Sequence, residues 1–196
     1  MMSEPAHKLA TYADLEAVPP HLVAEILFGA LVTHPRPVLK HAIAHSNLGA
    51  ELNLPFRRGK GGPGGWLFAN KPELHLGPHV VVPDLAGWRL ERLPALPETA
   101  WIEVVPDWIC EILSPSTEAY DKGAKRGIYA AHGLKHYWLL DPRAEVLEAF
   151  ELRDGQWVLL NTFSGADDVI AAPFAAVPFP LSALWPYDKS AESSTK

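Results

Sequence analysis

Two acidic residues stand out because apolar segments carry them. Asp84 ends the run VVVPD, and Glu111 lies inside DWICEIL. A carboxylate buried among apolar neighbours needs a cation or a hydrogen-bonding partner. Magnesium is held by one or two carboxylates plus waters, and it supplies the activated water and the charge stabilisation that phosphodiester hydrolysis needs. The two acids therefore predict a site for Mg²⁺, or for Mn²⁺ in its place, and the Ile112 carbonyl could add an oxygen ligand.

A predicted helix from Glu118 to His132 supplies the lysines of this region. Asp121, Lys125 and Tyr129 follow one another at i, i+4 spacing and therefore share one helix face. A lysine ammonium on that face can orient the attacking water or neutralise a phosphate. Lys122 competes with Lys125 for this role.

Two histidines lie one turn apart on a helix predicted over residues 38–54, with Pro55 beyond its end. The spacing of His41 and His45 is also that of zinc-binding histidines, but Ala42 stands where that motif has glutamate. Three interpretations stay open. The pair binds zinc, a single histidine such as His41 reaches into a neighbouring site, or both are partly exposed surface residues.

The segment RRGKGGPGG, residues 57–65, is the one basic, glycine-rich stretch. It lacks the Lys-Ser/Thr ending and the following helix of a nucleotide-binding loop, so we exclude nucleotide binding there. It is either a flexible connection or an arm on which Arg57, Arg58 and Lys60 contact phosphates.

Residues 21–34 predict a β-hairpin that turns at Phe28-Gly29, with a short helix through Leu27 as the alternative. Glu25 is the only acid in this apolar segment. A glutamate on an exposed strand face is its default interpretation. A short helix is expected before the hairpin, from Thr11 or Tyr12 to Val18.

The remaining strands are predicted at 66–70, 72–76, 79–88, 107–113 and 137–140. Pro83 removes a backbone donor just before Asp84 and indicates a bulge or a strand edge there. Period-two alternation places Ile109, Glu111 and Leu113 on one face of their strand. The Asp-Gly signal at 154–155 predicts a further hairpin near the C-terminus. The apolar segment 173–186 is expected to pack along an edge or on another subunit.

The bulk properties are those of an ordinary globular protein. The chain has 196 residues, 48% of them hydrophobic and 20% charged, which predicts one domain over residues 1–187 and a disordered polar tail over 188–196. A net charge of −6 excludes a global basic field that would attract nucleic acid. The single cysteine, Cys110, is expected to be buried in a reducing compartment. No run reaches the roughly 20 apolar residues of a membrane span, and no signal peptide is recognisable, so we expect a soluble, cytoplasmic protein without membrane partners.

Several strings together resemble the Uma family of putative restriction endonucleases, within the PD-(D/E)XK nuclease superfamily. They are EILFGALV, VVPDLAGW, PDWICEILSPST, the D-x-x-x-K-x-x-x-Y of the predicted helix and GLKHYWLLDP, and they span roughly residues 10 to 160. The resemblance implies an α/β fold with a restriction-endonuclease-like mixed β-sheet flanked by helices, to which a C-terminal β-hairpin is added. It also implies dependence on a divalent metal, DNA as the substrate, and a homodimer.

Carried over by position, Asp84 and Glu111 match the metal-binding acids of the family. Lys125 matches its helix-borne lysine, and Glu25 matches an acid from the hairpin segment. In the parent pattern a lysine follows the second acid by two residues on the same strand, but Leu113 occupies that position here. The hairpin turn, often Asp-Gly in the family, is Phe28-Gly29.

Three functions are compatible with these residues. The first is a Mg²⁺-dependent endonuclease acting on DNA. The second is a catalytically weak or inactive nuclease-fold module that binds nucleic acid or a protein partner as a dimer. The acidic charge balance and the absent strand lysine favour it. In the third, the two acids and the lysine form only a buried ion-pair cluster.

Overall fold

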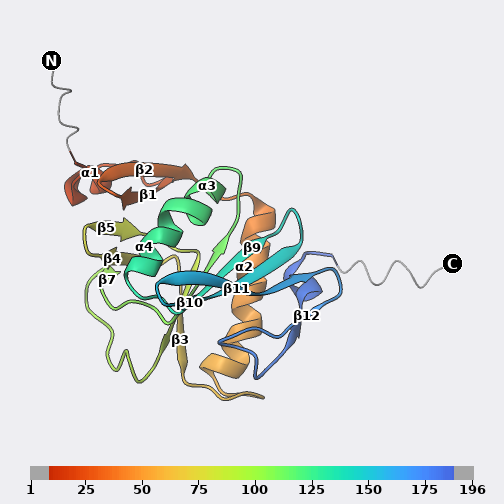
Figure 1. The fold of residues 1–196 in the computed structure, drawn as a ribbon. Helices are drawn as coiled ribbons and strands as arrows, with labels where there is room; N and C mark the ends of the chain where they lie inside the picture. Colours follow the sequence, from red (N-terminus) through yellow and green to blue (C-terminus); the bar gives the residue numbers. More distant parts are fainter. Residues whose placement is uncertain (1–8, 188–196) are drawn as a thin grey trace.

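The computed structural model describes residues 9–187 (Figure 1), so the predicted tail at 188–196 lies outside the described residues. The elements are α1 (Tyr12–Glu16), β1 (Leu22–Leu27), β2 (Ala30–Pro35), α2 (Leu39–Leu52), η1 (Asn53–Arg57), β3 (Trp66–Asn70), β4 (Glu73–Leu76), β5 (His79–Val81), β6 (Leu85–Arg89), β7 (Trp101–Ile102), β8 (Trp108–Ile112), α3 (Glu118–Tyr120), η2 (Asp121–Lys125), α4 (Arg126–Ala131), β9 (His136–Asp141), β10 (Val146–Arg153), β11 (Gln156–Ser164), β12 (Asp168–Val169), β13 (Phe179–Pro180) and η3 (Leu181–Leu184).

The strands form two main sheets and a small two-stranded one. The larger sheet has the order β11-β10-β9-β8-β6-β3, and the smaller has the order β2-β1-β5-β4-β7. Both are mixed, because β8 pairs parallel with β9 and β4 pairs parallel with β7, whereas their other pairs are antiparallel. The predicted C-terminal hairpin, β10–β11, extends the larger sheet through its pairing with β9.

Helices cover both faces of the larger sheet, and the alternation of β8 explains how. Trp108, Cys110 and Ile112 point into a core that includes residues of α2. Ile109 and Leu113 point into a second core that includes residues of α4. This confirms the predicted α/β class and the predicted faces of the strand. Cys110 is fully buried, as expected.

The first hairpin is formed as predicted, and the alternative helix through Leu27 is wrong. Leu27 pairs with Ala30 across a two-residue turn. Phe28 and Gly29 both have positive φ values, 50° and 77°, which the turn type that suits a twisted hairpin requires. Glycine adopts this conformation at little cost, whereas phenylalanine does not.

The run predicted as one strand over 79–88 is divided between the two sheets. β5 belongs to the smaller sheet and β6 to the larger, and Val82–Asp84 form the crossover between them. Proline at 83 fits a place where no ladder donor is needed. Asp84 therefore lies where the chain passes from one sheet to the other. Both flanking strands are interior strands of their sheets, so the expected strand edge was wrong.

Two predicted helices contain wide π turns. α2 continues into η1, which includes Pro55, so the expectation that this proline lies beyond the helix was wrong. The wider turn accommodates the proline ring and closes through the Arg58 N–H, which donates to the Asn53 carbonyl at 3.0 Å. The helix predicted over 118–132 is divided into α3, η2 and α4, and the π turn η2 carries Asp121 and Lys125. Such turns occur frequently at functional sites.

The C-terminal segment packs on the chain's own core through Phe174, Phe179, Leu181 and Leu184. The short strand β7 lies between the strands predicted at 79–88 and 107–113, where no strand was expected. The predicted hairpin at Asp154-Gly155 is present, and both turn residues have positive φ values. Within residues 9–187, no helix is long and apolar enough to cross a membrane.

Candidate active site

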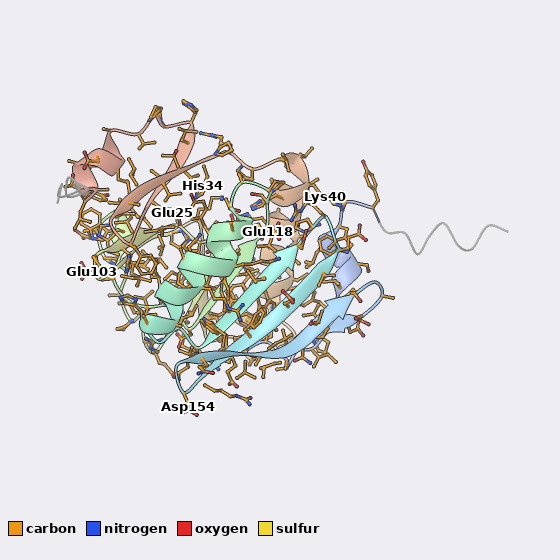
Figure 2. All side chains as sticks on the ribbon, turned by 45° about the horizontal axis from the view of Figure 1, so that its top comes forward. Glu25, His34, Lys40, Glu103, Glu118 and Asp154 are labelled. Atoms are coloured by element: carbon orange, nitrogen blue, oxygen red, sulfur yellow. The ribbon has the colours of Figure 1, made fainter. Side chains whose placement is uncertain are left out.

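Four acids and a lysine that the sequence singled out meet around one small cavity. Glu25, Asp84, Glu111, Asp121 and Lys125 are each at most 7% exposed. They line a cavity of about 40 Å³, which is room for about three water-sized particles. The cavity lies between the first hairpin, α2, the crossover, β8 and η2. In Figure 2, Glu25 and His34 lie close together on the hairpin, and Glu118 marks the start of the neighbouring helix.

Asp84 is held by donors from three elements. The amide of Ile112 donates to its Oδ2 at 2.9 Å, and His41 Nε2 donates to the same oxygen at 3.1 Å. Lys71 Nζ donates to Oδ1 at 2.7 Å. Burial would raise the pKa of this carboxyl, but His41 and Lys71 outweigh that effect and hold it well below its usual range. Asp84 is therefore ionised.

Glu111 lies next to Asp84 in a more negative environment. Its Oε1 accepts from the Tyr129 hydroxyl and from Lys125 Nζ, both at 2.7 Å, and its Oε2 accepts from the Asp84 amide at 3.2 Å. Burial raises the pKa of Glu111 to about 8, and the neighbouring carboxylates add to this rise while Lys125 opposes it. Glu111 thus retains a proton at neutral pH when no further cation is present.

Lys125 is surrounded by carboxylates. Its Nζ lies 2.7 Å from Glu111 Oε1, 3.2 Å from Glu25 Oε1 and 3.4 Å from Asp121 Oδ1. Burial would lower the pKa of this lysine, but the three carboxylates raise it well above its usual value, so it is charged. For Asp121, burial dominates and raises the pKa. The predicted face of Asp121, Lys125 and Tyr129 is thus assembled despite the π turn.

The default interpretation of Glu25 as an exposed strand residue was wrong. It is 2% exposed, and its Oε1 accepts a 2.7 Å hydrogen bond from the Val82 amide at the crossover. Burial would raise its pKa, but Lys125, the nearby His34 and this amide outweigh the effect and lower it. His34 Nε2 lies 3.3 Å from Glu25 Oε2. Alternation could not reveal this burial, because the hairpin is covered by elements distant in sequence.

The two helix histidines both contact Asp84. His41 is the histidine that reaches into a neighbouring site, whereas His45 is half-buried, so the interpretation of both as partly exposed residues was wrong for His41. His41 is buried and donates to the carboxylate, while His45 Nε2 donates to the Asp84 carbonyl at 2.8 Å. Desolvation lowers the pKa of His45. Throughout the described part of the chain, no three His, Cys, Asp or Glu side chains are grouped so as to hold a metal ion, and nothing supports the zinc alternative.

Four positively charged side chains that the sequence singled out lie away from the cavity. Lys122 donates to Glu118 at 2.8 Å on the exposed side of its helix and does not line the cavity. Arg57, Arg58 and Lys60 are exposed and follow the C-terminal end of α2, whereas His41 is near its N-terminal end. The structure therefore brings Lys125 to the acids and leaves the other four outside.

Lys71 is a residue of the cavity that sequence reasoning missed. It occupies the turn between β3 and β4 with a positive φ of 47°, and its amide donates to the Asp84 carbonyl at 2.9 Å. Its side chain is 36% exposed, against 4% for Lys125. The signal was weak, since a lysine before a proline in a turn belongs to no recognisable motif.

The acids fit a divalent cation chemically. Four carboxyl groups face the ammonium groups of Lys71 and Lys125, so two negative charges are uncompensated when all the acids are ionised. Asp84 Oδ2 and Glu111 Oε1 each already accept two hydrogen bonds. Asp84 Oδ1 and Glu111 Oε2 each accept one, which leaves one lone pair on each when both acids are ionised. Two carboxylate oxygens beside a cavity large enough for water form a donor set that suits Mg²⁺.

Comparison with solved structures defines the class of fold. The chain aligns with the crystal structure of a putative nuclease belonging to DUF820 from Anabaena variabilis, with a TM-score of 0.69 and 21% identity. The alignment covers 89% of this chain and 97% of that one. The chain therefore has the fold of that protein, and the predicted fold class is confirmed.

Sequence comparison gives the family. The family model Uma2, described as "Putative restriction endonuclease", matches residues 9–181, and the protein belongs to this family. An uncharacterized protein of Synechocystis sp. is 40% identical over 58 residues, which span 29% of this chain and 30% of that protein. The predicted family is confirmed.

Proposed function

We propose that this protein is a Mg²⁺-dependent endonuclease that hydrolyses phosphodiester bonds of DNA, with Mn²⁺ able to replace Mg²⁺. One observation carries the proposal. Asp84 Oδ1 and Glu111 Oε2, on two buried neighbouring acids beside one cavity, each have a free lone pair once both acids are ionised. Membership of a family described as "Putative restriction endonuclease" supports DNA as the substrate. The homodimer stays a prediction from the family resemblance.

In this proposal Asp84 and Glu111 hold the cation, and the Ile112 carbonyl is a further candidate ligand. When bound, the cation lowers the pKa of a water molecule and neutralises charge on the phosphoryl oxygens. His41 and the Ile112 amide fix the orientation of Asp84 through its other oxygen. Tyr129 and Lys125 do the same for Glu111.

Glu25 and Asp121 have a supporting role in the proposed site. Both carboxylates face the Lys125 ammonium, so they hold it against Glu111 and keep it charged. The lysine in turn neutralises part of the buried negative charge. Its orientation is therefore fixed before any substrate binds, which limits the energy lost to reorganisation during the reaction.

One observation favours the alternative of a nucleic-acid-binding module without cleavage. Lys125 Nζ is already bound by three carboxylates and its side chain is 4% exposed. A lysine so engaged is poorly placed to contact an attacking water. Under this alternative, DNA binds but is not cleaved with any divalent cation.

A cleavage assay with matched isosteric variants tests the proposal. The wild-type protein is incubated with plasmid and linear DNA in Mg²⁺, Mn²⁺ or EDTA, beside Asp84→Asn, Glu111→Gln and the surface control Lys122→Ala. We expect cation-dependent cleavage by the wild type and the control, and a loss of about a hundredfold or more in the two acid variants. Cleavage that persists in both acid variants would remove these residues from the reaction. Binding without cleavage by the wild type would favour the alternative.

A further inference from the structure

The two lysines of the cavity differ in how firmly they are held. Lys125 contacts three carboxylates and is 4% exposed. Lys71 contacts one carboxylate oxygen, Asp84 Oδ1, and is 36% exposed. Water stabilises a partly exposed ammonium when it leaves its partner. Lys71 can therefore move away at modest cost when another cation takes its place beside the buried Asp84 carboxylate, which His41 and the Ile112 amide still hold. Lys125 would leave buried carboxylates unpaired, which is far more costly.

Lys71 occupies the oxygen that a cation would need. Asp84 Oδ2 is saturated by His41 and the Ile112 amide, so Oδ1 is the oxygen of this carboxylate with a free lone pair. Lys71 Nζ lies 2.7 Å from that oxygen. A divalent ion on Oδ1 would therefore lie close to a positive ammonium, and the two would repel each other strongly.

The backbone of Lys71 is anchored independently of its side chain. Its amide donates to the Asp84 carbonyl, and Pro72 follows it. Its position at the cavity is therefore kept if the ammonium turns away from the carboxylate. A flexible side chain on a fixed backbone places the ammonium beside whatever anion enters the cavity from outside.

We propose that Lys71 is the exchangeable lysine of this site: it holds Asp84 while the divalent cation is absent, and it turns to a DNA phosphate when the cation binds. This assigns the substrate contact to Lys71 and leaves Lys125 as the fixed positioning residue of Glu111. The inference rests on the proposed function for the identity of the substrate. The competition between Lys71 and the cation for Asp84 can nevertheless be measured without any cleavage.

Cation affinity is the decisive measurement. Mn²⁺ binding is followed by electron paramagnetic resonance and calorimetry for the wild type, Lys71→Asn, Lys71→Arg and Lys122→Ala. Asparagine removes the charge and tolerates the positive φ at this position. We expect Lys71→Asn to bind Mn²⁺ about tenfold more tightly than the wild type, and the other two variants to bind it as the wild type does. A merely structural role would give weaker binding instead. Unchanged or weaker binding by Lys71→Asn, or no Mn²⁺ binding by any of the proteins, would overturn the inference.

The phosphate contact is measured separately on a 20-base-pair duplex in Ca²⁺, chosen to favour binding over cleavage. We expect Lys71→Asn to bind this duplex several-fold more weakly than the wild type in Ca²⁺, although it binds the cation more tightly. Equal DNA affinity of Lys71→Asn and the wild type would overturn the proposed contact of Lys71 with a phosphate. If Lys71→Asn behaves as expected but no protein cleaves DNA, the proposed enzymatic function fails while the exchange stands. If the wild type cleaves DNA but Lys71→Asn has unchanged affinity for Mn²⁺ and for DNA, the exchange is wrong while the proposed enzymatic function stands.

Discussion

At the scale of single residues, the site is defined by which carboxylate oxygens are already occupied. Two oxygens are saturated by fixed donors, which orient Asp84 and Glu111. The other two oxygens each keep a lone pair. The excess negative charge is absorbed by a proton, because Glu111 and Asp121 both have raised pKa values. A cation that replaced this proton would relieve the same excess charge.

The contribution of Glu111 to the stability of the metal-free protein should therefore fall as the pH rises from about 4.5 to about 8. The pKa of Glu111 rises from 4.5 to about 8 on folding, so the unfolded chain loses this proton first. The stabilisation is complete below the unfolded pKa and is lost as the pH passes the folded one, at a cost of a few kcal/mol. The pKa of Asp84 is lowered from its usual value of 3.8, so its contribution to stability is lost only as the pH falls below that value, outside this window.

Glu111→Gln isolates the effect, because glutamine does not titrate but its carbonyl still accepts from Tyr129. Urea denaturation in EDTA between pH 5 and 8.5 would compare the two proteins. We expect the wild type to lose stability relative to the variant across this range. The same pH slope in both would show that Glu111 is ionised throughout.

At the scale of elements, the crossover between the sheets creates the site. The segment Val82–Asp84 leaves the smaller sheet and enters the larger one, and Glu25 from β1 binds its amide. Glu25 also contacts Lys125 on η2. One carboxylate therefore connects the hairpin, the crossover and the helix that carries the lysine.

Replacing Glu25 by leucine should cost about 3 kcal/mol or more, because the Val82 amide and Lys125 would lose a buried partner. Glu25→Gln should cost clearly less, since its carbonyl oxygen can still accept from that amide. Chemical denaturation at pH 7 measures both, with Glu148→Gln, a half-buried residue of β10 away from the cavity, as a control expected to be near neutral. Equal losses for leucine and glutamine would mean that the amide contact contributes little.

The sequence predicted local features better than long-range ones. The turn at Asp154-Gly155, the alternation about Glu111 and the helix face of Lys125 follow from rules that span a few residues, and they are present in the structure. The burial of Glu25 and the contact of Lys71 with Asp84 depend on which strands pair and which helix covers them. Such pairings are set by the fold as a whole, so no local pattern contains them.

At the scale of the whole molecule, charge is distributed unevenly along α2. The chain carries a net charge of −6, and four acids surround the cavity at the N-terminal end of this helix. The basic loop follows its other end. Arg57 comes 16 residues after His41, which corresponds to roughly 24 Å of helix, or about seven base pairs of DNA. A duplex longer than this could contact both ends.

If the loop contacts phosphates, the triple variant Arg57→Gln/Arg58→Gln/Lys60→Gln should bind a 24-base-pair duplex about tenfold more weakly in Ca²⁺. The slope of log affinity against log salt should also become less steep, by about 0.9 for each phosphate that the loop no longer neutralises. Cation affinity should not change, because these residues are remote from the cavity. Titrations at several salt concentrations measure this, with Arg153→Gln at the tip of the β10–β11 hairpin as the control. An unchanged slope would identify the loop as a connection between α2 and β3, and would leave the cavity and its cation as the main determinants of DNA binding.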